Sequence, residues 1–195
     1  MSERAERPLI GCYPGTFDPL TIAHLALAHA AVAQGGLDKI DLVVSRSALG
    51  KAEGGRPLLE HRIAVLHAAA ATRPWLGVRL TDARLMVDVA DGYDVVVMGA
   101  DKWSQVCDPV WYAEAEVGRD AAVARLLDRV LVAPRAPHPV PDGRGLDVEH
   151  RFTLMSSSAV RAGTWEWMAA EARAFDEQTG AWSDPARYDA WLEDG

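Results

Sequence analysis

The stretch from Leu9 to Ala33 restricts the fold of this chain more than any other part of the sequence. Its first residues form an apolar run that predicts a buried strand, which Pro14 and Gly15 bring to an end. Thr21 is a good N-cap residue, so the spacing predicts a helix that carries His24 at its third position. The free amides and the dipole of a helix entrance favour an anion. A strand, a glycine turn and a helix entrance with a histidine together predict a phosphate-binding site.

The remainder of the chain alternates strand-like and helical segments. Further strands are predicted at 39–45, 75–80, 93–98 and 130–133, and helices at 58–72, 81–89, 109–117, 120–127, 158–173 and 186–192. Residues 46–57 and 134–145 are rich in glycine or proline, which is typical of loops. The alternation predicts an α/β fold, a Rossmann-like parallel sheet with helices on both faces.

Two polar segments follow strands of this predicted sheet. One is the turn from Gly15 to His24, and the other is Gly99-Ala100-Asp101, which follows the strand at 93–98. Ligands of open parallel sheets bind at the carboxyl ends of the strands, so we expect these segments to share a site. The sequence has no GxGxxG after the first strand and no GxxxxGK[ST], so the site is neither a dinucleotide fingerprint nor a P-loop.

Composition excludes several kinds of partner. The formal charge of −8 over 195 residues argues against broad binding to nucleic acid or to an anionic membrane surface. No segment approaches the ~20 apolar residues that span a bilayer, and residues 1–7 lack the apolar core of a secretory signal. We therefore expect a cytoplasmic protein of one domain, 1–195, in which residues 163–195 form a C-terminal helical tail. The cysteine and histidine spacings predict no disulfide framework and no bound structural metal.

Two motifs carry a resemblance to a known family. The residues Gly15-Thr16-Phe17-Asp18-Pro19, followed by His24, resemble the first motif of the nucleotidylyltransferase superfamily, whose signature is HxGH. His24 matches the final histidine, Thr21 stands in place of the first, as in the phosphopantetheine branch, and Ala23 replaces the glycine. The run from Ser156 to Arg161 is similar to the ISSTxxR motif of the same family. The regions around residues 61–66 and 99–103 are most like the nicotinate/nicotinamide mononucleotide adenylyltransferases.

The resemblance implies a reaction and assigns roles to particular residues. The phosphate of a small acceptor would attack the α-phosphorus of ATP, which Mg²⁺ accompanies, and pyrophosphate would leave. His24 would stabilise the charge that develops on the α-phosphate, and the planar fork of Arg161 would hold the departing pyrophosphate. Thr16 and Lys51 complete the implied catalytic set. The implied nucleotide-binding residues are Gly15, Thr16, Phe17, Thr21, His24, Gly99, Asp101, Ser156, Ser157, Ser158 and Arg161, and the acceptor-binding candidates are Lys51, Arg62, Trp103 and Trp111.

Several alternatives remain open at this stage. Thr21 can be an N-cap and nothing more, and Asp18 is more often a carboxylate that fixes a turn than a metal ligand. Tryptophans such as Trp103 and Trp111 are usually packing residues. A mononucleotide acceptor is favoured, with phosphopantetheine second because of Thr21. Two further hypotheses are a cytidylyltransferase and a nucleotide-binding protein of the same fold without turnover. The sequence also leaves open whether the protein forms a homo-oligomer.

Overall fold

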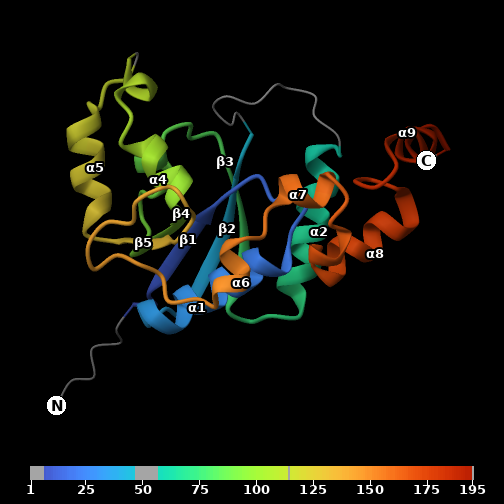
Figure 1. Ribbon diagram of the computed structural model, residues 1–195, viewed down its shortest axis with the longest axis horizontal. Helices are drawn as coiled ribbons and strands as arrows, with labels where there is room; N and C mark the ends of the chain where they lie inside the picture. The colour runs from blue at the N-terminus through green and yellow to red at the C-terminus, as the bar shows by residue number, and fades with distance from the viewer. Residues whose placement is uncertain (1–6, 47–56, 114, 195) are drawn as a thin grey trace.

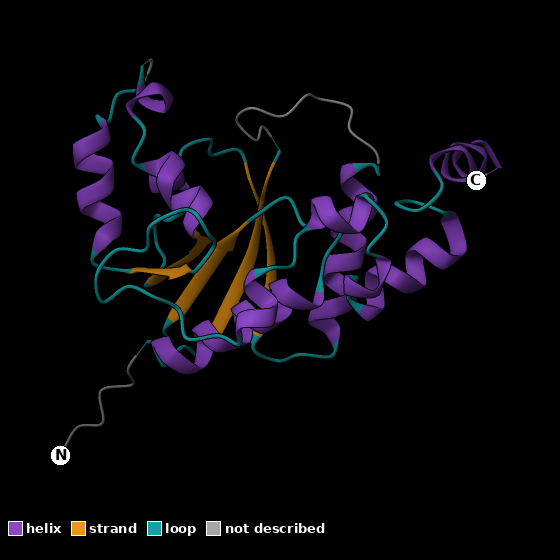
Figure 2. Ribbon diagram, viewed as in Figure 1, coloured by secondary structure: helices purple, strands orange, loops and turns teal. Residues whose placement is uncertain are grey.

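A five-stranded parallel sheet forms the centre of the molecule. It was analysed in a computed structural model that describes residues 7–46, 57–113 and 115–194. The strand order is β3-β2-β1-β4-β5, and every neighbouring pair is parallel. The predicted α/β class is therefore confirmed (Figures 1 and 2). The strands are β1 (Ile10–Pro14), β2 (Lys39–Ser45), β3 (Leu76–Thr81), β4 (Val95–Gly99) and β5 (Val130–Ala133).

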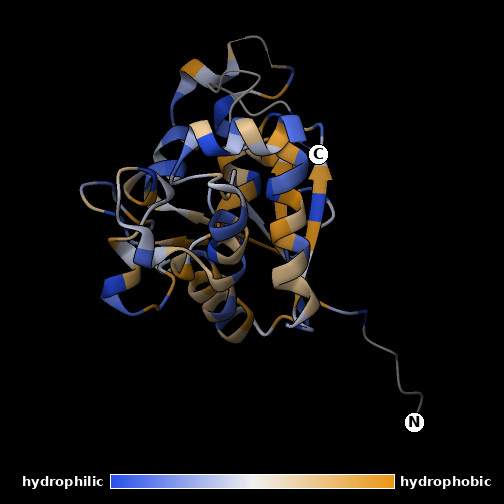
Figure 3. Cartoon of the chain, turned by 90° about the vertical axis from the view of Figure 1, so that its right-hand side faces the viewer, coloured by the Kyte–Doolittle hydropathy of each residue, from blue (hydrophilic) through white to orange (hydrophobic). Residues whose placement is uncertain are grey.

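Two hydrophobic cores lie on opposite faces of this sheet because successive strand residues point to opposite sides. Tyr13 and Val97 belong to one core, whereas their neighbours Cys12 and Val96 belong to the other. Strands that are buried on both faces are largely hydrophobic. Most strand residues here are apolar, with Lys39, Asp41 and Arg79 as the charged exceptions in β2 and β3, and Figure 3 shows orange strands, one of them with a blue band. The first core is covered by α1 (Ile22–Gly35), α2 (Leu59–Ala71), α6 (His150–Thr153), α7 (Ser157–Arg161) and α8 (Ala170–Thr179), and the second by α3 (Met86–Val89), α4 (Ala100–Val106) and α5 (Arg119–Leu127).

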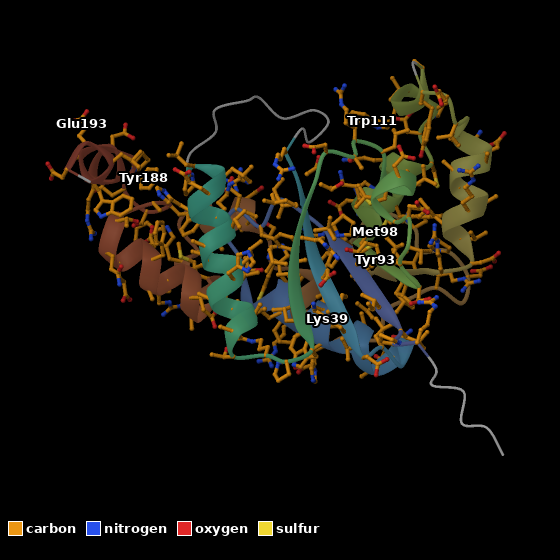
Figure 4. All side chains as sticks on the ribbon, turned by 180° about the vertical axis from the view of Figure 1, so that it is seen from behind. Lys39, Tyr93, Met98, Trp111, Tyr188 and Glu193 are labelled. Carbon is orange, nitrogen blue, oxygen red and sulfur yellow. The ribbon has the colours of Figure 1, made fainter. Side chains whose placement is uncertain are left out.

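The C-terminal part of the chain continues past α7 along α2. A 3₁₀ turn at Trp165–Trp167 leads into α8, which contacts α2, and α9 (Pro185–Asp194) follows. Tyr188 of α9 is fully buried, and Figure 4 shows its ring between α9 and α2. Its hydroxyl accepts a hydrogen bond from the Leu58 amide at 3.0 Å and lies 2.6 Å from His61 Nδ1. The tail is thereby attached to the start of α2.

Three of the predicted helices differ from the observed structure. The helix predicted at 81–89 is wrong over its first half, because Thr81 ends β3 and only Met86–Val89 is helical. The helix predicted at 109–117 is a 3₁₀ turn over Pro109–Tyr112, and the α4 helix before it was not predicted. The helix predicted at 158–173 is interrupted, since Gly163 adopts a φ of 118° that side-chain-bearing residues avoid.

Within the part of the chain that the structure describes, none of the helices has both the length and the apolar character needed to cross a membrane.

Candidate active site

A cavity of about 360 Å³ lies at the carboxyl end of the sheet. This volume is in the range of small-molecule sites, and the position is the one at which parallel sheets bind ligands. Segments far apart in the sequence line it: the β1–α1 turn, the β3–α3 connection, the start of α4, the loop after β5, and α6 with α7. The two polar segments predicted to share a site, Gly15 to His24 and Gly99 to Asp101, do so.

The glycine turn after β1 is built around the ring of Phe17. This residue has a φ of 45°, and its buried ring meets the rings of Tyr13 and His24 edge-on at centroid distances of 5.5 and 5.1 Å. A Cβ atom at Gly15 would lie 2.8 Å from the same ring, so the turn requires glycine there. The Thr16 carbonyl accepts a hydrogen bond from Arg62 Nη1 at 3.1 Å. Packing and side-chain contacts thus fix the shape of the turn.

His24 is held in one orientation by the entrance of α1. Thr21 is the N-cap, as predicted, and its hydroxyl accepts a hydrogen bond from the His24 amide at 3.2 Å. In return, His24 Nδ1 accepts a hydrogen bond from the Thr21 amide at 3.0 Å, which completes a capping box. Because Nδ1 is an acceptor, the proton of the neutral ring resides on Nε2. The imidazole, which lines the cavity, therefore provides an Nε2–H donor.

The enclosure of His24 keeps its ring neutral. Burial, and to a smaller extent the positive charge of Arg135, lower its pKa to about 4. A neutral imidazole with a fixed N–H can donate a hydrogen bond to a phosphate oxygen at physiological pH. It does not act there as a fixed positive charge.

The pKa of His24 leads to a pH prediction. An unfolded histidine titrates near 6.5, so between that pH and about 4 the unfolded state binds a proton that the folded state excludes. The free energy of unfolding should fall as the pH falls through this window, and His24 should contribute no pH dependence above it. NMR titration of the His24 ring should give a midpoint near 4. His24→Asn should unfold with a shallower pH dependence below 6.5, and a wild-type midpoint near 6.5 would contradict the assignment.

The second motif is attached directly to the first. Ser156 is the N-cap of α7, and its hydroxyl accepts from the Ala159 amide at 3.1 Å. Ser157 Oγ donates to the Pro19 carbonyl at 2.9 Å. Arg161 donates to the Asp18 carbonyl, and its Nη1 lies 3.5 Å from Asp18 Oδ2. The motif residues that line the cavity are His24, Gly15, Thr16, Phe17, Ser156, Ser157, Ser158 and Arg161.

An ion pair forms another part of the cavity wall. Asp101, at the start of α4, lies 3.5 Å from Arg135 Nε, and Arg135 Nη2 donates to the Met155 carbonyl at 3.0 Å. A Cβ atom at Gly99 would lie 2.4 Å from Asp101 Oδ1, so a side chain there would displace the carboxylate from its present position. Arg135 was not among the predicted site residues. The available signal was its place after a buried strand at the same sheet edge, at 130–133.

Cations outnumber carboxylates around the cavity. Among the described lining residues, Asp101 is the one carboxylate, whereas Arg84, Lys102, Arg135 and Arg161 are basic. Lys102 Nζ donates to Gln105 Oε1 at 2.7 Å, and burial lowers the Lys102 pKa. Sequence reasoning missed Arg84 because the segment that contains it was predicted to be helical. The local basic surplus suits a phosphorylated ligand even though the chain as a whole is acidic.

Three of the predicted site residues that the structure describes, Thr21, Arg62 and Trp103, are not in the cavity wall. Thr21 is fully buried and its hydroxyl caps α1, so the implied phosphate contact is not seen. Arg62 supports the glycine turn through the Thr16 carbonyl. Trp103 is buried in the second core, so it cannot stack on an acceptor. Lys51 falls outside the described residues. Trp111, by contrast, is 36% exposed and lines the cavity, and Figure 4 shows it on the α4 side of the sheet.

The position of Trp103 leads to a stability prediction. Trp103→Ala should lower the free energy of unfolding by about 3–5 kcal/mol, because it removes a large side chain from a packed core. Chemical denaturation measures this change. Trp111→Ala is the matched control and should cost clearly less, since its ring is partly exposed. Equal losses in the two variants would contradict the assignment of Trp103 to the core.

The described residues do not form a metal centre of their own. No group of three or more histidine, cysteine, aspartate or glutamate side chains in these parts of the chain could hold a metal ion. Asp101, the carboxylate in the cavity wall, already faces Arg135. Mg²⁺ is commonly bound through substrate phosphates with few protein ligands, and this wall fits such an arrangement.

The fold and the site define an α/β protein whose pocket, at the carboxyl edge of a parallel sheet, joins two motifs that lie far apart in the sequence. Residues 12–163 match the family model described as cytidylyltransferase-like, and the chain therefore belongs to this family of nucleotidyltransferases.

Named relatives are found in two bacteria. The chain is 31% identical over 137 residues to a probable nicotinate-nucleotide adenylyltransferase of Bordetella petrii. The aligned region covers 64% of this chain and 69% of the relative. The chain is also 31% identical over 167 residues to a protein of the same name from Bordetella avium, covering 77% of this chain and 81% of the relative. The predicted superfamily and the predicted enzyme class are confirmed.

Proposed function

We propose that this nucleotidyltransferase transfers the adenylyl group of ATP to the phosphate of nicotinate or nicotinamide mononucleotide and releases pyrophosphate, a step of NAD biosynthesis in the cytoplasm. The observation that carries the proposal is the presence of His24 and Arg161, from motifs far apart in the sequence, in the wall of one basic cavity. The names of the two bacterial relatives support the choice of acceptor.

The proposed chemistry requires only positioning and charge stabilisation. The acceptor phosphate attacks the α-phosphorus in line, and the bond to the pyrophosphate oxygen breaks, so no covalent enzyme intermediate forms. The His24 Nε2–H donates to the α-phosphate oxygens, on which negative charge increases in the transition state. Arg161 and the α7 serines bind the β- and γ-phosphates as pyrophosphate leaves. Mg²⁺ held through the substrate phosphates would supply neutralisation of part of their charge.

Trp111 is the residue that we propose binds the base of the acceptor mononucleotide. Trp111, Arg84 and Lys102 all line the cavity, so it offers an aromatic ring on which a flat base can stack and cations that can meet a phosphate. Trp111→Ala is expected to raise KM for the acceptor roughly tenfold, the loss of one stacking contact, with KM for ATP little changed. Steady-state kinetics with each substrate varied in turn measures this. A selective rise in KM for ATP would contradict the assignment.

Pyrophosphate release across a panel of substrates tests the function as a whole. The enzyme is supplied with ATP or CTP, and with nicotinate mononucleotide, nicotinamide mononucleotide, phosphopantetheine or no acceptor. The proposal predicts release with ATP and a pyridine mononucleotide. Preference for phosphopantetheine or for CTP would overturn the acceptor or the donor, respectively. ATP binding by calorimetry without release in any combination would identify a binding protein without turnover.

A further inference from the structure

The C-terminal tail contacts the first motif of the active site through one side chain. Trp182 lies in the connection between α8 and α9, beyond the residues that match the family, which end at 163. Its indole Nε1 donates a hydrogen bond to Asp18 Oδ1 at 2.8 Å, across 164 positions of the sequence. Asp18 belongs to the glycine turn that carries the phosphate-binding residues. A segment outside the family match therefore contacts the site.

The indole of Trp182 is itself held firmly. Asp176, a buried carboxylate at the end of α8, accepts hydrogen bonds from the Trp182 amide at 2.7 Å and from the Ser183 amide at 3.0 Å. The indole is only 6% exposed and packs edge-on against the Phe175 ring. A side chain fixed in this way can hold the group that it contacts in one orientation.

The carboxylate of Asp18 is shared between the tail and Arg161. Oδ1 accepts from the indole, and Oδ2 lies 3.5 Å from Arg161 Nη1. A carboxylate binds a guanidinium most strongly when both oxygens meet the fork. Because Oδ1 accepts the hydrogen bond from Trp182, only Oδ2 of the Asp18 carboxylate faces Arg161. Arg161 Nη1 also donates to the Asp18 carbonyl, so this nitrogen is held by Asp18. Nη2 makes only a long contact of 3.4 Å with Ser158 Oγ, and the guanidinium lines the cavity.

We infer that Trp182 is a positioning residue for phosphate binding: its indole N–H keeps Asp18 from forming a two-oxygen ion pair with Arg161, and so leaves Nη2 of the guanidinium available to pyrophosphate and to the β- and γ-phosphates of ATP. The inference rests on the proposed function, in which Arg161 binds these phosphates. Trp182 does not touch the substrate and acts through Asp18.

Backbone contacts already hold the same turn without the indole. The Ala169 amide donates to the Leu20 carbonyl at 3.0 Å, and Thr21 and Met168 form an antiparallel bridge. Removal of one N–H from Trp182 should therefore leave the fold intact. Trp182→Phe keeps an aromatic ring in the buried position and deletes the donor, which separates positioning from packing.

The first test measures binding of inorganic pyrophosphate by calorimetry and KM for ATP. Trp182→Phe should weaken pyrophosphate binding roughly tenfold and raise KM for ATP similarly, with kcat nearly unchanged. Trp165→Phe, at an exposed tail tryptophan, is the matched control and should change neither. In an Asp18→Asn background the Trp182 substitution should cost little, since the competing carboxylate charge is gone. Full affinity in Trp182→Phe, or an undiminished cost in the Asp18→Asn background, would overturn the inference.

The second test requires neither ligand nor turnover. The NMR signal of the Trp182 indole N–H is assigned by its loss in Trp182→Phe and is then followed in Arg161→Gln. Because Arg161 shares the Asp18 carboxylate with the indole, the signal should move, whereas Arg119→Gln, in which an exposed arginine is changed, should leave it in place. An unmoved signal overturns the positioning role whatever the ligand data show. If wild-type protein binds neither pyrophosphate nor ATP, the proposed function fails, and the signal still decides whether the three residues are coupled.

Discussion

Replacing His24 by alanine is expected to lower kcat for pyrophosphate release by about 10²–10³-fold, the cost of losing one donor aimed at a developing oxyanion. The imidazole is neutral, oriented by its Nδ1 hydrogen bond to the Thr21 amide, and part of the cavity wall. In the proposed mechanism its Nε2–H stabilises the transition state more than it stabilises bound ATP, so KM for ATP should change much less than kcat.

His24 also completes the cap of α1, and a control must separate this role from catalysis. Thr21 is not part of the cavity wall, and Thr21→Ala removes the capping hydroxyl, which also lies 3.0 Å from His24 Nδ1, but keeps the Thr21 amide that donates to the same nitrogen. It should cost about 1 kcal/mol of stability and leave kcat within a few-fold of wild type. If Thr21→Ala lowered kcat as much as His24→Ala does, the effect would belong to the helix entrance and the catalytic role of His24 would be wrong.

Replacing Arg161 by glutamine is expected to lower kcat/KM for ATP by about 10²-fold, because a planar cation that meets two phosphate oxygens at once is lost. Pyrophosphate affinity should fall with it, which calorimetry measures independently of turnover. Arg161 is suited to the role because its side chain is 39% exposed and lines the cavity beside the α7 serines.

Two substitutions separate the contribution of the positive charge of Arg161 from that of its planar guanidinium fork. Arg161→Lys keeps the charge but not the fork, and should recover only part of the loss. Arg119→Gln removes an exposed arginine that pairs with Asp120 outside the cavity, and should have no effect. Full activity in Arg161→Gln would show that the second motif does not hold the phosphates.

Local rules account for the part of the site that the sequence predicted. The strand, the glycine turn and the Thr21 cap lie within a few residues of one another, and each follows from residue type and spacing. The same holds for Ser156 and Arg161 around α7. Since carboxyl ends of parallel strands meet at one edge, topology then brought the two motifs into one cavity.

Longer-range features could not be predicted in this way. Trp103 and Trp111 were both predicted to bind the acceptor, yet the register of α4 buries the first in the core and the turn after α4 leaves the second at the cavity. Arg135 lies just after β5, the strand next to β4, and reaches Asp101 at the start of α4. The hydrogen bond from Trp182 to Asp18 spans most of the chain, and no spacing in the sequence indicates it.

The most direct test of the central claim is a crystal structure of the protein soaked with ATP and Mg²⁺. We predict that the triphosphate occupies the cavity at the carboxyl edge of the sheet, with His24 Nε2 within hydrogen-bond distance of an α-phosphate oxygen and Arg161 on the β- or γ-phosphate. A triphosphate bound elsewhere, or bound in this cavity out of reach of both side chains, would contradict the account.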